Sequence, residues 1–288
     1  MSIEFIKHRT FESNGVQLAA KEWGEPSGLP VIALHGWLDN ANSFDQMLPH
    51  LQGMHVIAVD MAGHSQSGDR SADSGYDIWQ DIADVLAISE QMGWEQFSLL
   101  GHSRGAIVSA LFAGTFPKLV SHCLLIDSYF PIPTKPGNAA GQLAKAITDK
   151  KRFQTIKPSA FNSFEDAVQA RVNGFVPLQK QAATILAERG VVEINGKFSW
   201  RNDQRLKSSS MITFTKDQCE SFFTAIQCPM MLIQAQSGLL QGPIQPQLQQ
   251  WVPHIEVVSM AGSHHLHLED QAQQVAEKAQ QFFNPSKS

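Results

Sequence analysis

Residues 97–108 read FSLLGHSRGAIV, and this stretch decides how the rest of the chain is interpreted. An apolar run leads up to Gly101, Ser103 stands between two glycines, and a segment of small and apolar residues follows. The pattern predicts a strand, a sharp turn and a helix, with Ser103 at the apex of the turn. An apex residue has a strained backbone and needs very small neighbours two positions before and after it. Because the helix N-terminus also presents N–H groups beside its hydroxyl, Ser103 is a candidate nucleophile.

Short apolar runs on both sides of this stretch alternate with segments of helical periodicity. Such runs are typical of strands that are buried on both faces of a parallel sheet and connected by helices. We therefore predict an α/β fold with a mostly parallel central sheet flanked by helices. The expected strands are 3–7, 16–23, 30–34, 55–59, 97–102, 122–126, 229–233 and 255–258, and the expected core helices are 76–92, the segment after Ser103, and 268–283.

Polar residues follow several of these strands where each strand ends. The carboxyl ends of parallel strands meet at one edge of the sheet, where ligand and active sites of open α/β sheets lie. We therefore expect a functional site formed by residues from this edge, which include His35, Asp60, Ser103, Asp127 and the histidines at 264, 265 and 267.

Residues 129–215 interrupt the alternation of strands and helices. Residues 130–210 carry a net charge of +7, whereas the remainder of the chain carries −12. We predict a core formed by residues 1–128 and 216–288, with residues 129–215 inserted as a mainly helical cap. Its expected helices are 139–151 and 164–189. An independent second domain is the alternative, but a segment that leaves and rejoins one sheet favours an insertion.

Composition excludes several classes of protein. The net charge is −5, and the basic residues are scattered without a nucleic-acid-binding motif, so no nucleic-acid partner is expected. No apolar run reaches the roughly 18 residues that a membrane span requires. Three cysteines without metal-ligand spacing indicate reduced thiols, and the N-terminus lacks the apolar core of a signal peptide, so we expect a cytoplasmic protein. The sequence does not indicate an oligomeric state.

Four motifs together resemble the α/β-hydrolase superfamily. They are His35-Gly36-Trp37, residues 60–67, residues 101–105 and residues 263–269. Residues 198–206 narrow the resemblance to the serine hydrolase-like proteins. The resemblance implies an α/β-hydrolase fold with a cap and a catalytic triad in the chain order serine, acid, histidine.

The resemblance assigns the nucleophile to Ser103 and the general base to His264. Similar hydrolases usually carry the triad acid after the strand that matches 229–234, but residues 234–241 contain no carboxylate. Asp127, which ends the preceding strand, is the expected acid because some family members carry it there. The alternative is that Asp127 is a structural residue of that strand end.

The resemblance also implies an oxyanion hole and a substrate-binding wall. The backbone amides of Trp37 and Arg104 are expected to bind the oxyanion. His35, His102 and Phe130 are the expected substrate-binding residues, with His35 more structural than catalytic. The histidines of 264–269 form either part of a triad or a metal cluster. We favour the triad because no further ligand set stands out, so no metal and no cofactor are expected.

The sequence therefore predicts a serine-dependent hydrolase that cleaves a small to medium carboxylic ester through an acyl-enzyme. The partner is a small molecule, and the aromatic residues of the cap indicate an apolar acyl or alkyl part. One alternative keeps the triad but cleaves a thioester, amide, lactone or carbon–carbon bond. The other is a degenerate hydrolase that binds a ligand or a regulatory partner, which the missing carboxylate after 229–234 supports.

Overall fold

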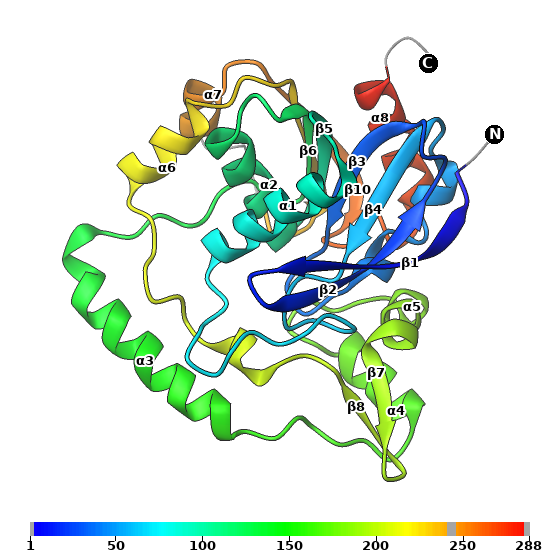
Figure 1. Ribbon diagram of the computed structural model, residues 1–288, viewed down its shortest axis with the longest axis vertical. Coiled ribbons are helices and arrows are strands. Elements are labelled where there is room, and N and C mark those ends of the chain that lie inside the picture. The colour runs from blue at the N-terminus through cyan, green and yellow to red at the C-terminus, as the bar shows by residue number, and fades with distance from the viewer. Residues whose placement is uncertain (1–2, 241–245, 285–288) are drawn as a thin grey trace.

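The computed structural model describes residues 3–240 and 246–284. Eight strands form one twisted sheet in the order β1-β2-β4-β3-β5-β6-β9-β10 (Figure 1). The β1–β2 and β2–β4 pairs are antiparallel, and all other neighbours are parallel. The mostly parallel sheet is therefore confirmed. The strands are β1 (Phe5–Ser13), β2 (Val16–Trp23), β3 (Leu29–Leu34), β4 (Met54–Val59), β5 (Phe97–His102), β6 (Val120–Ile126), β9 (Met230–Ser237) and β10 (Ile255–Ser263).

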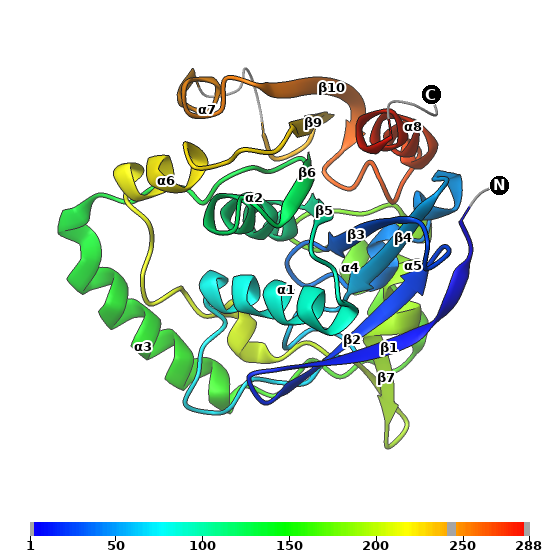
Figure 2. The same cartoon turned by 45° about the horizontal axis from the view of Figure 1, so that its top comes forward.

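Helices cover both faces of the sheet. One buried cluster joins the sheet to α1 (Ile78–Met92), α2 (Arg104–Thr115), α6 (Lys216–Phe223) and α7 (Pro246–Trp251). The other joins the opposite face to α8 (Ala272–Phe283) and to two short 3-10 turns, η1 (Ala41–Phe44) and η2 (Leu48–His50). Figure 2 shows α1 and α2 side by side and α8 on the other side of the strands. Burial on both faces explains why β4 and β5 are buried at every position.

The segment between β6 and β9 adds no strand to the central sheet. It contains α3 (Ala139–Thr155), α4 (Phe164–Val172), α5 (Lys180–Gly190), the hairpin β7 (Val191–Ile194) and β8 (Lys197–Trp200), and the turns η3 (Pro136–Asn138) and η4 (Gln204–Lys207). In Figure 1 the long helix α3 runs along one side of the molecule, and the β7–β8 hairpin projects beside α4 at the bottom of the view. The described part of the chain contains no helix that is both long enough and apolar enough to cross a membrane.

Two details of this segment differ from the sequence prediction. The single helix expected over 164–189 is two helices, because Gly174 and Pro177 lie between α4 and α5 and both residues disfavour a helix interior. The hairpin β7–β8 was not predicted. Its turn is Asn195-Gly196, with φ values of 51° and 71°, which is the residue pair that a tight two-residue hairpin prefers.

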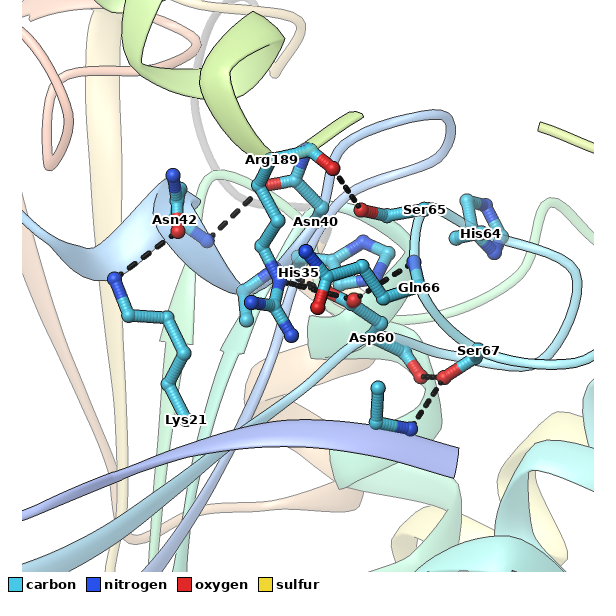
Figure 3. Close-up of polar contacts among 12 residues, drawn as sticks. Lys21, His35, Asn40, Asn42, Asp60, His64, Ser65, Gln66, Ser67 and Arg189 are labelled. Atoms are coloured by element: carbon cyan, nitrogen blue, oxygen red, sulfur yellow. Dashed lines mark hydrogen bonds and ion pairs between the residues drawn. The ribbon is translucent and has the colours of Figure 1, made fainter. Parts of the chain in front are cut away.

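A buried ion pair joins this segment to the sheet. Arg189 of α5 donates from Nε to both carboxylate oxygens of Asp60, at 2.9 Å each, just after β4 (Figure 3). The same carboxylate accepts from the amides of Ala41 and Gln66. Asn40 extends the junction by donating from its side chain to the carbonyl of Leu186 in α5. Asp60 therefore fixes the loops at the strand ends and fastens α5 above them.

Candidate active site

Ser103 stands at the turn between β5 and α2 in a backbone conformation that side chains rarely adopt. Its φ is 52° and its ψ is −115°. The turn is tight because a Cβ at position 101 would lie 2.4 Å from the carbonyl oxygen of Gly105. One at position 105 would lie 2.0 Å from the carbonyl oxygen of Leu34 in β3. The two glycines therefore let helix, turn and strand pack against one another and hold Ser103 at the apex.

His264 and Asp127 form a buried hydrogen-bonded pair beside this turn. His264 follows the last residue of β10, and its Nδ1 lies 2.6 Å from Oδ2 of Asp127. Donation of the Nδ1 proton to the carboxylate leaves Nε2 as the basic nitrogen of the ring. Asp127 follows β6 with a φ of 47°, so it also has a strained backbone. The pair has the arrangement in which a carboxylate orients a histidine base.

The end of β9 and the loop after it hold Asp127 in place with backbone groups. The amide of Ala235 donates to Oδ1 at 3.0 Å, and the amide of Leu239 donates to Oδ2 at 2.9 Å. Gly238 lies against the same carboxylate, and a Cβ there would lie 2.1 Å from Oδ2. The end of β9 and the loop after it, which carry no carboxylate of their own, therefore contribute amide donors and space to the carboxylate of Asp127.

A second aspartate pairs with the neighbouring histidine. His265 Nε2 lies 3.1 Å from Oδ2 of Asp39, and Nη2 of Arg171, in α4, lies 2.9 Å from Oδ1. Burial raises the pKa of Asp39, but the charges of His265 and Arg171 outweigh it and hold that pKa well below its usual range. Sequence reasoning missed this cluster because Asp39 and His265 are 226 positions apart. The only sequence signal was an acidic residue two positions after the His-Gly-Trp turn.

These groups lie around one cavity of about 300 Å³. Ser103, His102, His264 and Trp37 line it, together with Arg171 of α4. The rest of the wall is mainly apolar and comes from both parts of the chain, including Leu38, Phe161, Phe175, Val176, Trp200 and Leu239. The structure thus brings one expected substrate-binding residue, His102, and the candidate serine and histidine to the same cavity.

The other two expected substrate-binding residues lie elsewhere. His35 is fully buried, donates from Nδ1 to the carbonyl of Gly36 at 2.7 Å, and accepts at Nε2 from the amide of Met61 at 3.0 Å. Phe130 packs against Phe223 and Trp251 beneath α6 and α7. Neither is among the residues that line the cavity. His35 connects two loops, and Phe130 belongs to the core.

The residues expected to form the oxyanion hole flank Ser103. Trp37 lines the cavity after Gly36, and its indole Nε1 donates to the carbonyl of Leu206. Arg104 is the first residue of α2, and its guanidinium turns away to Asp81 at 2.6 Å. Its side chain is therefore anchored elsewhere, and its backbone amide remains at the helix N-terminus beside Ser103.

Comparison with known proteins establishes the family. The profile of the family described as alpha/beta hydrolase fold matches residues 30–271. The chain belongs to the α/β-hydrolase family. This α/β-hydrolase is 29% identical to a serine hydrolase-like protein of Danio rerio, over 88% of this chain and 81% of the relative. It is 30% identical to serine hydrolase-like protein 2 of Homo sapiens, over 77% and 72% of the two chains.

A solved structure extends the likeness to three dimensions. The α/β-hydrolase superposes on a hypothetical protein from Pseudomonas aeruginosa PAO1 with a TM-score of 0.89 and 37% identity. The alignment covers 96% of this chain and 98% of that one. The predicted resemblance to the α/β-hydrolases and to the serine hydrolase-like proteins is therefore confirmed.

Proposed function

We propose that this α/β-hydrolase is a serine hydrolase that cleaves a carboxylic ester through an acyl-enzyme. The observation that carries the proposal is the 2.6 Å contact between His264 Nδ1 and Asp127 Oδ2, with Asp127 held by two backbone amides. This contact supplies the acid that the loop after β9 lacks. It also removes the main argument for a degenerate hydrolase.

The proposed chemistry begins with Ser103. Its Oγ attacks the ester carbonyl while Nε2 of His264 takes the hydroxyl proton, and the resulting imidazolium is stabilised by Asp127. The tetrahedral oxyanion is stabilised by the backbone amides of Trp37 and Arg104. His264 then protonates the departing alcohol and leaves an acyl group on Ser103, which water hydrolyses by the same steps in reverse order.

Residues 129–215 are proposed to act as a cap that closes over the acyl or alkyl part of the substrate. The support is that apolar side chains of this segment, such as Phe161, Val176 and Trp200, share the cavity wall with Ser103. A cavity of about 300 Å³ at the lower end of the usual range for ligand pockets favours a small to medium ester.

A fluorophosphonate probe tests the proposal directly. We expect the wild-type chain to be labelled at Ser103 and the Ser103→Ala variant to remain unlabelled, with nitrophenyl esters hydrolysed only by the former. Circular dichroism of both proteins controls for folding. Absence of labelling in the folded wild-type protein would overturn the proposal in favour of a binding protein. Labelling of Ser103 with turnover of a thioester or amide, but not of an ester, would show that the enzyme cleaves a different bond from the one proposed.

A further inference from the structure

A compact group of three metal-ligating side chains lies beside the candidate nucleophile but has no part in the proposed triad. Its members are Asp39, His102 and His265, whose exposed fractions are only 1%, 0% and 2%. One ligand atom from each lies within 4.8 Å of the others. All three residues line the cavity that Ser103 lines. The three residues are far apart in the sequence: His102 ends β5, Asp39 lies in the loop after β3, and His265 lies in the loop after β10.

The distances from Asp39 to the two histidines are close to those between ligand atoms around a small metal ion. Asp39 Oδ2 lies 3.1 Å from His265 Nε2 and 3.7 Å from His102 Nδ1. Ligands bound at about 2.1 Å in tetrahedral geometry lie roughly 3.4 Å apart, a value between these two distances. The ligand atoms of the whole group lie within 4.8 Å of one another, so the two histidines would have to draw together to seat a cation between the three atoms.

His102 is already oriented as a ligand. Its Nε2 donates to the carbonyl of His264 at 3.0 Å, which fixes the tautomer and leaves a lone pair on Nδ1. Nδ1 points toward Asp39, is buried, and has no hydrogen-bond partner among the described residues. Metal-binding histidines characteristically use their second nitrogen in this way, and a buried acceptor without a donor costs free energy.

Arg171 is the group that a cation must replace. Its Nη2 lies 2.9 Å from Asp39 Oδ1 and 3.4 Å from His265 Nε2, so the guanidinium supplies the positive charge that the site attracts. Two like charges at these distances repel strongly in a buried site. A bound metal would therefore displace Arg171 from Asp39 and loosen the contact between α4 and the core.

We propose that Asp39, His102 and His265 bind a divalent transition metal, in competition with the Arg171 guanidinium. Two imidazole nitrogens and one carboxylate oxygen suit Zn²⁺, Co²⁺ or Ni²⁺ and not Mg²⁺ or Ca²⁺, which take oxygen ligands. Three protein ligands leave a coordination position for water or an anion. That position would face the cavity next to Ser103.

The test is a Co²⁺ titration of the full chain after chelator treatment and removal of the chelator. We expect saturable binding of one equivalent, visible as d–d absorption that Zn²⁺ abolishes and Mg²⁺ does not. His264→Phe and His265→Phe form a matched pair, because they change neighbouring buried histidines that pair with different aspartates. We expect His265→Phe to lose about tenfold or more in affinity, and His264→Phe to keep it.

The Arg171→Gln variant tests for an increase in Co²⁺ affinity, which damage to the fold would not produce. It removes the competing charge, so we expect tighter Co²⁺ binding than in the wild-type chain. Absence of saturable binding in both the wild type and Arg171→Gln would overturn the proposal. Equal loss in the two histidine variants would also overturn it, because it would place the ion on His264. None of these readouts requires hydrolase activity, so the proposal can fail while the proposed function stands.

Discussion

His264 and His265 are neighbours in the chain, and each pairs with a buried aspartate in a different environment. Asp127, the partner of His264, accepts from backbone N–H groups of β9 and of the loop after it. Asp39, the partner of His265, faces the guanidinium of Arg171 from the inserted segment. Neutral backbone dipoles surround the carboxylate of Asp127, whereas the carboxylate of Asp39 is paired with the charge of an arginine. The same two side-chain types thus suit a catalytic pair in one place and a junction in the other.

The largest effect is expected from Asp127→Asn. The neutral amide does not stabilise the imidazolium as a carboxylate does, and its NH2 group can face Nδ1 and favour the wrong tautomer, so kcat for ester hydrolysis should fall by about 10³ to 10⁴. Asp39→Asn is the matched control, for which we expect a loss of less than about tenfold, because it removes no group from the proposed proton relay. Steady-state kinetics measures both. Unchanged turnover in Asp127→Asn would show that Asp127 is not the triad acid.

Removal of Arg189 should give the largest loss of stability. Its side chain is 3% exposed and that of Asp60 is fully buried, so Arg189→Met leaves a buried carboxylate without its cation. The free energy of unfolding should fall by about 3 to 5 kcal/mol. Urea unfolding measures the change. A loss below about 1 kcal/mol would mean that this pair behaves as a surface ion pair.

Arg171→Met should cost less than Arg189→Met. Arg171 is 15% exposed, and Asp39 retains His265 as a partner after the substitution. We expect a loss of about 1 to 3 kcal/mol, together with a raised KM because Arg171 lines the cavity. Urea unfolding and ester kinetics test the two parts. If Arg171→Met lowered the free energy of unfolding as much as Arg189→Met, the Arg171–Asp39 and Arg189–Asp60 pairs would not differ in the way proposed.

The smallest effect concerns buried histidines that bond to the backbone in place of a carboxylate. His64 Nδ1 donates to the carbonyl of Ala62, and burial holds the pKa of His64 well below 6.5 and also lowers that of His35. The unfolded chain therefore binds protons that the folded chain does not, so stability should fall as the pH drops below about 6.5. The slope should be about 1.4 kcal/mol per pH unit for each such histidine.

Urea unfolding between about pH 7.5 and pH 5.5 measures this slope for the wild type and for His64→Gln. We expect the slope of stability against pH to be smaller in the variant, by the contribution of one proton. A wild-type stability that is constant over this range would contradict the prediction.

The sheet was predictable because its strands are apolar on both faces and end at polar residues. The start of each parallel strand differs by at most two residues from the expected position, and β10 runs on to Ser263, directly before His264. The inserted segment was less predictable, since its helices are amphipathic and broken. The turn signal Asn195-Gly196 would have revealed its hairpin.

The candidate site was predictable only where one short motif carries it. Ser103 and His264 lie in such motifs, and the structure brings Asp127 to His264. Asp39, Arg171 and His265 converge only because α4 folds back over the sheet, and no local pattern records that contact. Phe130 was misplaced because an aromatic residue four positions after the end of β6 can turn toward the core as readily as toward the cavity.

The close approach of Gly238 to Asp127 constrains how such an enzyme can evolve. A side chain at position 238 would need the volume that the carboxylate of Asp127 now fills. A mutation that adds an acidic residue at position 238 would therefore displace Asp127 from His264 before the new carboxylate could pair with that histidine. If Asp127 is the triad acid, as proposed, a lineage that moves the acid from position 127 to the loop after β9 must change both positions together or pass through an ancestor with impaired catalysis.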